Sequence, residues 1–222
     1  IKAGLRSTTK QLRSNYCRSM QTIEEQVTGD IYDENRNFNY YTAQMYASLF
    51  FTKDSVCGEN NIVTGTAFST AGKSGLEKNK EQLKMLFFNP GKRINGLPFI
   101  SNKTAIYDDE MADKYDMSID IDMFKSQSCY IFTQKVKPEN KDDVIVDEMT
   151  TWFNDQTFEV VARNYSLSYS AGVYDFKVQM EVVMTKFGEY LVPSVIRYIG
   201  NWKAIFKPRE RGIFTATLFD FN

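Results

Sequence analysis

Residues 173–184 read Val-Tyr-Asp-Phe-Lys-Val-Gln-Met-Glu-Val-Val-Met. Apolar and polar residues alternate through this stretch, and successive side chains of a strand point to opposite faces of its sheet. One side is apolar and the other is polar; the apolar side holds Tyr174, Phe176, Val178, Met180, Val182 and Met184. The stretch therefore predicts a long β-strand whose dry face, rich in Met and aromatic residues, must be covered.

Other segments predict further strands of the same sheet. Residues 115–123 alternate in the same way, and residues 129–136 follow after a short polar turn, so the two segments predict a hairpin. The remaining candidate strands are 41–51, 61–71, 143–153, 156–165, 189–199, 201–207 and 212–221. Short connections favour antiparallel pairing, and a sheet of so many long strands must twist and curl.

The beginning of the chain predicts an amphipathic helix. Leu5, Leu12, Tyr16 and Met20 recur at spacings of seven and four, with polar residues between them. We therefore expect one domain over residues 1–222 that is mainly β. It consists of an N-terminal helix at 1–28 and, at 40–221, one large, strongly curved antiparallel sheet, which is an incomplete β-barrel.

The composition excludes several classes of function. The 27 basic and 28 acidic residues leave no basic surface for nucleic acid. No apolar run is long enough to span a bilayer, so the chain is not expected to cross a membrane. The chain has no histidine, which excludes Ser-His-Asp catalysis and His-ligated metals.

The three cysteines, Cys17, Cys57 and Cys129, are an odd number at wide spacing. This pattern is neither a disulfide framework nor a zinc site. We interpret them as packed or idle thiols, because a free cysteine behaves as a small buried hydrophobe. No metal ligand and no cofactor is assigned, and the redox compartment stays open.

Two short motifs match a nucleotide hydrolase in a permissive form. Ala67-x4-Gly72-Lys73-Ser74 resembles a P-loop, and residues 144–148 resemble the acidic strand that holds magnesium. That fold needs parallel strands buried on both faces, whereas almost every strand predicted here alternates. The hydrolase is therefore kept only as an unfavoured alternative.

A stripe of acidic residues follows the polar side of the strand at 115–123. Asp116, Asp120 and Asp122 share this side with Ser118, and several carboxylates in one place suit calcium. A glycine-bearing calcium loop is missing, however, and alternation places these groups on a wet face. We interpret the stripe as a solvated surface.

The order of the predicted elements resembles that of the bacterial lipoprotein-carrier superfamily, the LolA/LolB-like proteins. The resemblance is one of overall pattern, and its first element is the N-terminal amphipathic helix. It rests on YYTAQMYASLFF (40–51), NIVTGTAF (61–68), EQLKMLFFNPG (81–91), YDMSIDIDMF (115–124), CYIFTQKVKP (129–138), WFNDQTFEVVAR (152–163), YDFKVQMEVVM (174–184) and GEYLVPSVIRY (188–198).

The resemblance implies an incomplete barrel whose concave side is plugged by helices and accepts acyl chains. It implies a hydrophobic lining on the strands and part of a lid on the first helix. The lining residues are Met45, Met117, Ile119, Ile121, Phe176, Val178, Met180 and Val182, and the lid residues are Leu12 and Tyr16. It also implies a periplasmic or outer-membrane-associated protein whose export signal has been removed, peripheral to or anchored at the membrane.

The expected function is non-catalytic. We expect a cell-envelope protein that binds a lipid, an acyl chain or another hydrophobic ligand in the concave face, with a lipid or an acylated protein as its partner. The first alternative is an envelope module that binds another protein and no ligand. The second is the P-loop nucleotide hydrolase.

Overall fold

The computed structural model describes residues 3–13, 18–28, 86, 90–91, 93–94, 100–172, 174–188, 190–204 and 209–219. Within these ranges lie nine strands: β1 (Ala3–Arg13), β2 (Arg18–Thr28), β3 (Tyr115–Phe124), β4 (Gln127–Val136), β5 (Val146–Asn154), β6 (Val160–Ala171), β7 (Tyr174–Phe187), β8 (Tyr190–Ala204) and β9 (Glu210–Phe219). The short helices are η1 (Ser101–Lys103), α3 (Asp109–Ala112) and η2 (Pro138–Asp143).

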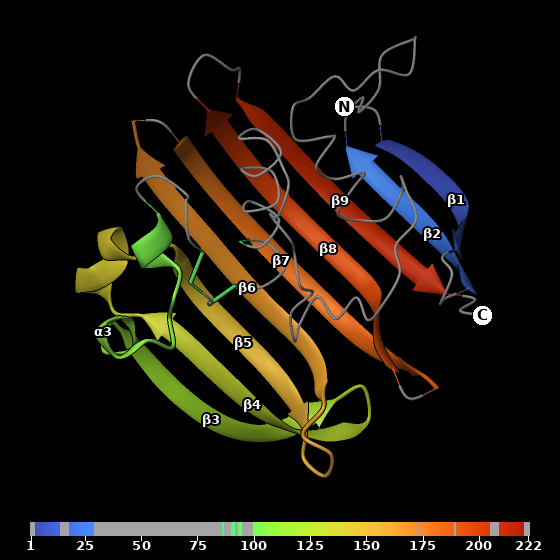
Figure 1. Cartoon of the computed structure of the whole chain (residues 1–222), viewed down its shortest axis with the longest axis horizontal. Helices are drawn as coiled ribbons and strands as arrows, with labels where there is room; N and C mark the ends of the chain where they lie inside the picture. The colour runs from blue at the N-terminus through green and yellow to red at the C-terminus, as the bar shows by residue number, and fades with distance from the viewer. Residues whose placement is uncertain are drawn as a thin grey trace.

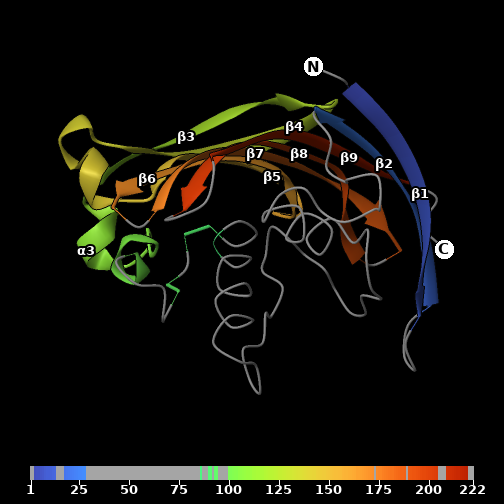
Figure 2. The same ribbon diagram turned by 90° about the horizontal axis from the view of Figure 1, so that it is seen from above.

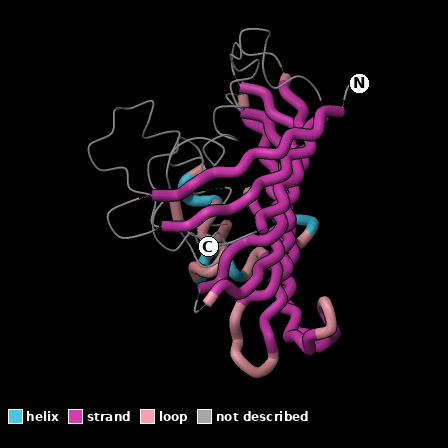
Figure 3. The backbone as a smooth tube through the Cα atoms, turned by 90° about the vertical axis from the view of Figure 1, so that its right-hand side faces the viewer, coloured by secondary structure: helices cyan, strands magenta, loops and turns pink. Residues whose placement is uncertain are grey.

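All nine strands form one antiparallel sheet in the order β1-β2-β9-β8-β7-β6-β5-β4-β3. Strands β3 to β9 follow one another as a meander, and the β1–β2 hairpin adds to β9. In Figure 1, β1 and β3 lie at opposite margins of the sheet. Figures 2 and 3 show one curved layer that does not close, which confirms the prediction of a mainly β, open, curved sheet.

The predicted N-terminal helix at 1–28 is wrong. Residues 3–13 and 18–28 form β1 and β2, paired from Ala3↔Thr28 to Arg13↔Arg18. The apolar spacing suggested a helix, but Thr8, Thr9, Thr22 and Ile23 are β-branched residues that favour strands. The decisive contribution is tertiary: β2 pairs with β9 over Thr22–Val27, and this pairing overrides a weak local preference.

The predicted break between strands at 189–199 and 201–207 is also wrong, because β8 continues through Gly200. Gly200 lies opposite Val178 on one side and Gly212 on the other. A Cβ atom at Gly200 would lie 1.9 Å from the Tyr198 hydroxyl oxygen. The glycine therefore makes room for the Tyr198 side chain inside a strand, and does not mark a turn.

The other strand predictions in the described part are confirmed, with shifted ends. The strands predicted at 143–153 and 156–165 begin later, because η2 and the turn at 154–159 take up their first residues. Pro193, expected at a strand end or edge, lies in the inner strand β8 where the register with β7 shifts. A bulge is a position where a sheet tolerates proline. The strands predicted at 41–51 and 61–71 lie outside the described residues.

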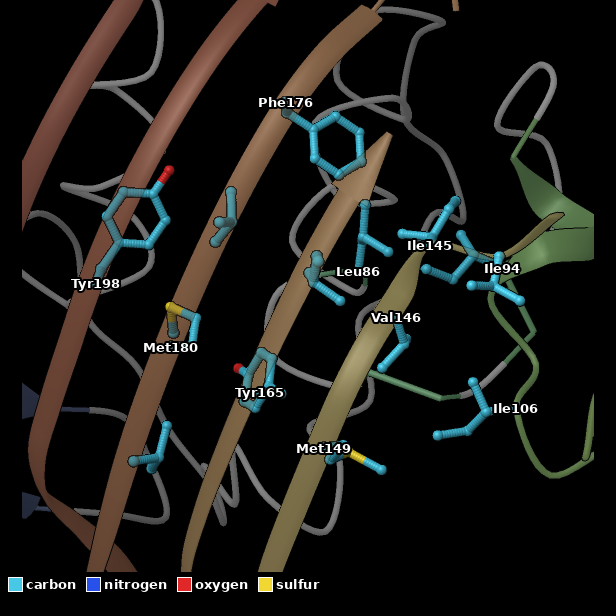
Figure 4. Packing of buried hydrophobic residues seen from close by; sticks show 14 of the residues in the cluster. Leu86, Ile94, Ile106, Ile145, Val146, Met149, Tyr165, Phe176, Met180 and Tyr198 are labelled. Carbon is cyan, nitrogen blue, oxygen red and sulfur yellow. The ribbon is translucent and has the colours of Figure 1, made fainter. Parts of the chain in front are cut away.

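The hydrophobic core lies on the concave face of the sheet. Strands β5 to β8 supply one side of the core, including Met149, Tyr165, Val178 and Tyr198. Residues that precede β3 in the chain supply the other side: Leu86, Ile94, Ile100, Ile106 and Met111. Figure 2 shows α3 on the inner side of the arch, and Figure 4 shows Ile94 beside Ile145.

Candidate functional site

The predicted lining residues of β3 and β7 share one face of the sheet. Ile119 on β3 is opposite Phe132 on β4, which is opposite Thr151 on β5. Thr151 is opposite Arg163 on β6, and Arg163 is opposite Val182 on β7. Residues directly opposite in a sheet project from the same face. The apolar sides of β3 and β7, which are distant in sequence, therefore belong to one continuous concave surface.

The predicted lining residues of β7 lie inside the core. Phe176, Val178, Met180 and Val182 are all buried, and they belong to the same cluster as Leu86. Figure 4 shows Phe176 and Met180 among the other core side chains. In the described part of the chain these four residues thus pack against protein, and their contact with a ligand stays a prediction.

The predicted lining residues of β3 are exposed instead. Met117, Ile119 and Ile121, together with Met123, are between 44% and 69% exposed. Phe158, from the turn between β5 and β6, is 67% exposed and stacks on Tyr130 with ring centroids 6.0 Å apart. Tyr130 is opposite Ile121. These six residues are called the β3 patch below: Met117, Ile119, Ile121, Met123, Tyr130 and Phe158.

The turn that carries Phe158 is held by several hydrogen bonds. The Phe158 amide donates to the Asn154 carbonyl (2.9 Å), and the Thr157 amide donates to Asn154 Oδ1 (2.9 Å). Phe158 has a φ of 58°, a left-handed conformation that is costly for a bulky residue. The turn therefore holds an aromatic ring at the surface despite backbone strain.

A polar cluster interrupts the concave face beside the patch. Arg163 Nε donates to Thr151 Oγ1 (2.9 Å), and the Tyr107 hydroxyl donates to Gln134 Oε1 (3.3 Å). Gln134 is fully buried, and its Nε2 has no hydrogen-bond partner among the described residues. Burial lowers the pKa of the Arg163 guanidinium and raises the pKa of the Tyr107 hydroxyl.

Sequence analysis missed the polar cluster and the aromatic pair Tyr130–Phe158. A signal for part of the cluster was present. Gln134 is in phase with the inward-facing Tyr130 and Phe132, and Arg163 is in phase with Tyr165 and Leu167. A polar residue at an inward position of an alternating strand marks a buried polar group. Tyr107 and Phe158 lie in turns, where the sequence has no periodicity that indicates which way a side chain points.

The described strands do not match the fold of a P-loop hydrolase, because all of them run antiparallel. The acidic motif at 144–148 leads into β5, where Asp147 Oδ1 accepts a hydrogen bond from the Ser168 hydroxyl (2.7 Å). Burial raises the pKa of Asp147. Lys73 and the rest of the other motif lie outside the described residues.

Two hollows in the described part lie away from the β3 patch. One, of about 420 Å³, is lined by Lys103, Asp147, Tyr169 and Phe176, among others. The other, of about 380 Å³, lies on the polar face beside Glu148, Gln179 and Arg197. Neither matches the expected apolar hollow, because charged and polar side chains line much of both.

The remaining predicted residues have different outcomes. Leu12 lies in β1 and not on a helical lid, whereas Tyr16 and Met45 lie outside the described residues. Cys129 is buried, and Cys17 and Cys57 also lie outside the described part. Among the described residues there is no cluster of three or more Cys, Asp or Glu side chains placed to hold a metal ion. No helix in that part is long and apolar enough to span a bilayer.

Comparison with known proteins gives one structural match. No protein-family model and no curated protein matches the chain. Among solved structures, the chain is similar to a DUF1329 family protein from Desulfovibrio piger ATCC 29098, at 10% identity over 98% of this chain and 76% of that chain. The TM-score is 0.26, which does not establish a shared fold. Membership of the LolA/LolB-like superfamily therefore stays a prediction from the sequence.

Proposed function

We propose that this protein is a non-catalytic carrier or receptor that binds an acyl chain of a lipid or an acylated protein on the concave face of its sheet, at the β3 patch. The supporting observation is the exposure of the patch, which continues the face that elsewhere forms the buried core. A contiguous exposed apolar surface marks an interaction site. The cell envelope, implied by the sequence resemblance, is the proposed location.

The chemistry of the patch suits a flexible apolar ligand. Met117 and Met123 have polarizable, unbranched side chains that adapt to irregular shapes. Ile119, Ile121 and Phe158 provide rigid apolar area between them. Each methylene that leaves water on binding contributes about 0.8 kcal/mol, so even part of an acyl chain gives measurable affinity.

The polar cluster is the proposed binding place for the polar end of the ligand. Arg163 is opposite Thr151, which is opposite Phe132, the neighbour of Ile119. Strands lie about 4.8 Å apart, so Arg163 is about 14 Å from Ile119 along this row. A few polar groups in a mainly apolar face fix the orientation of a ligand. The Arg163 guanidinium favours a carboxylate or phosphate.

The test is titration with a fluorescent fatty-acid analogue. The double variant Ile119→Asp/Ile121→Asp introduces two charges into the patch, and we expect it to lower the affinity for the analogue by about tenfold or more. The matched control is Ile199→Asp/Ile213→Asp. These residues are opposite each other on the polar face and are 49% and 50% exposed, so they carry a comparable change away from the patch.

The proposal predicts loss of binding in the patch variant and wild-type affinity in the control. Equal effects of both double variants, or no uptake of the analogue by the wild-type protein, would overturn it. Magnesium-dependent ATP binding that is lost in Lys73→Ala would instead support the hydrolase. A partner protein captured through the patch, without any bound lipid, would support a module that binds protein alone.

A further inference from the structure

The outer edge of β3 lacks most of the features that normally prevent a strand from pairing with another chain. Among the described strands β3 pairs only with β4, and it lies at the margin of the sheet in Figure 1. Its ten residues contain no proline and no lysine, and the β3–β4 register has no shift. Edge strands are usually protected by charged side chains, especially lysine, and by prolines, bulges or short length. Of these protections β3 has only its aspartates, which repel another acidic strand but not a basic one.

The turn after β3 determines which backbone groups point outward. Lys125 and Ser126 have φ values of 46° and 64°, and Phe124 is paired with Gln127. This is a two-residue turn with two left-handed residues, in which the flanking residues exchange hydrogen bonds. Every second residue pair along an antiparallel hairpin also exchanges backbone hydrogen bonds. The backbone groups of Asp116, Ser118, Asp120 and Asp122 are therefore the ones that bond to β4.

The apolar residues of β3 therefore direct their N–H and C=O groups away from the sheet. This holds for Met117, Ile119 and Ile121. The Met123 amide supports the assignment, because it donates to Asp122 Oδ1 (2.7 Å) and so does not bond to β4. These three alternate residues, Met117, Ile119 and Ile121, offer a partner strand a ladder of backbone hydrogen bonds.

The side chains of β3 determine the chemistry of such a partner. Exposed apolar side chains project from the concave face, and exposed carboxylates project from the other. Asp116, Asp120 and Asp122 form no ion pair with a basic group in the described part of the chain. Opposite charges across neighbouring strands stabilise a sheet, and like charges destabilise it.

We propose that the outer edge of β3 binds an extended segment of another protein in which apolar residues alternate with lysine or arginine. The segment adds to the sheet as a further strand next to β3. Its apolar side chains lie beside Ile119 and Ile121, and its basic side chains lie beside Asp120 and Asp122. A second copy of β3 is a poor occupant, because every antiparallel alignment of two acidic stripes places aspartates near aspartates.

The probe is a labelled peptide as long as β3, in which valine and lysine alternate, with binding measured by fluorescence anisotropy. A peptide of the same composition arranged in two blocks is the control for charge alone. We expect the alternating peptide to bind at least about tenfold more tightly than the block peptide. Asp120→Lys/Asp122→Lys should abolish this binding and create binding of a valine–glutamate peptide.

Ile119→Pro and Ile119→Ala separate the backbone from the side chain. Both variants remove the isoleucine side chain, but only the proline removes the outward N–H group. We expect a clearly greater loss of affinity in Ile119→Pro than in Ile119→Ala, with both variants keeping the wild-type circular dichroism spectrum. The charge reversal at the exposed Asp120 and Asp122 provides the decisive result if the proline variant does not fold.

Three outcomes would overturn the proposal. One is equal binding of the alternating and block peptides, and another is an alternating peptide that is unaffected by the charge reversal. The third is a dimer in sedimentation equilibrium that Ile119→Pro dissociates, because the occupant would then be a second copy. Titration of Asp120→Lys/Asp122→Lys with the fatty-acid analogue separates the two sites. This variant should keep the wild-type affinity for the analogue, because acyl binding depends on the apolar face of β3 and the charge reversal lies on the opposite face.

Discussion

Val178 and Ile119 lie on the same face of the sheet in opposite surroundings. Val178 is 0% exposed and Ile119 is 69% exposed. Val178→Asp should lower the free energy of unfolding by about 3–5 kcal/mol, since it leaves an uncompensated charge in the core. Ile119→Asp should change it by no more than about 0.5 kcal/mol. Urea denaturation measures both, and a large loss in Ile119→Asp would show that the patch is covered by protein.

Phe158 combines backbone strain with exposure of an aromatic ring. In Phe158→Asn the left-handed conformation costs less, which offsets the lost stacking on Tyr130, so stability should stay within about 1 kcal/mol of wild type. The affinity for the fatty-acid analogue should nevertheless fall, because the ring contributes apolar area to the patch. Denaturation and titration test the two parts separately. Unchanged affinity would remove Phe158 from the proposed site.

At the scale of elements, the bulge where β5 meets β6 places Asp147 in a partly buried position. Its pKa is raised by burial, although the Ser168 hydroxyl donates to it. The folded state therefore holds the proton more tightly than the unfolded state. Stability is lost as pH rises from the unfolded pKa of about 3.9 through the raised folded pKa.

Asp147→Asn removes this titration and keeps an oxygen that accepts from Ser168. We expect the variant to gain stability over wild type at pH 7 and to gain less at about pH 3.5. Thermal unfolding of both proteins at the two pH values measures the difference. A gain that is the same at both values, or greater at the lower one, would contradict the raised pKa.

The periodicity of single elements predicted most of the sheet but not its ends. Strands β3 and β7 follow from alternation, because each has one apolar and one polar side, and β4 follows from the short polar turn after β3. The β1–β2 hairpin could not be predicted, since its strand character depends on pairing with β9, nearly two hundred residues away in sequence. Gly200 resembled a turn because the position of the Tyr198 side chain cannot be read from the sequence.

At the scale of the whole molecule, the concave face of the sheet is buried in one part and exposed in another. Over β5 to β8 it is covered by Leu86, Ile94, Ile100, Ile106 and Met111, whereas over β3 it is exposed. Alternation identifies the side to which an apolar residue points. It does not reveal whether another segment covers that residue, because coverage depends on contacts between distant parts of the chain. The predicted lining residues of β3 and β7 therefore lie on one face, but only those of β3 are exposed.

Native mass spectrometry of freshly purified protein tests the central claim most directly. If the concave face binds an acyl chain, the wild-type protein should carry added mass that fragments to fatty-acid ions, and Ile119→Asp/Ile121→Asp should carry none. Wild-type protein of bare polypeptide mass that also gains no mass from added fatty acid would contradict the account.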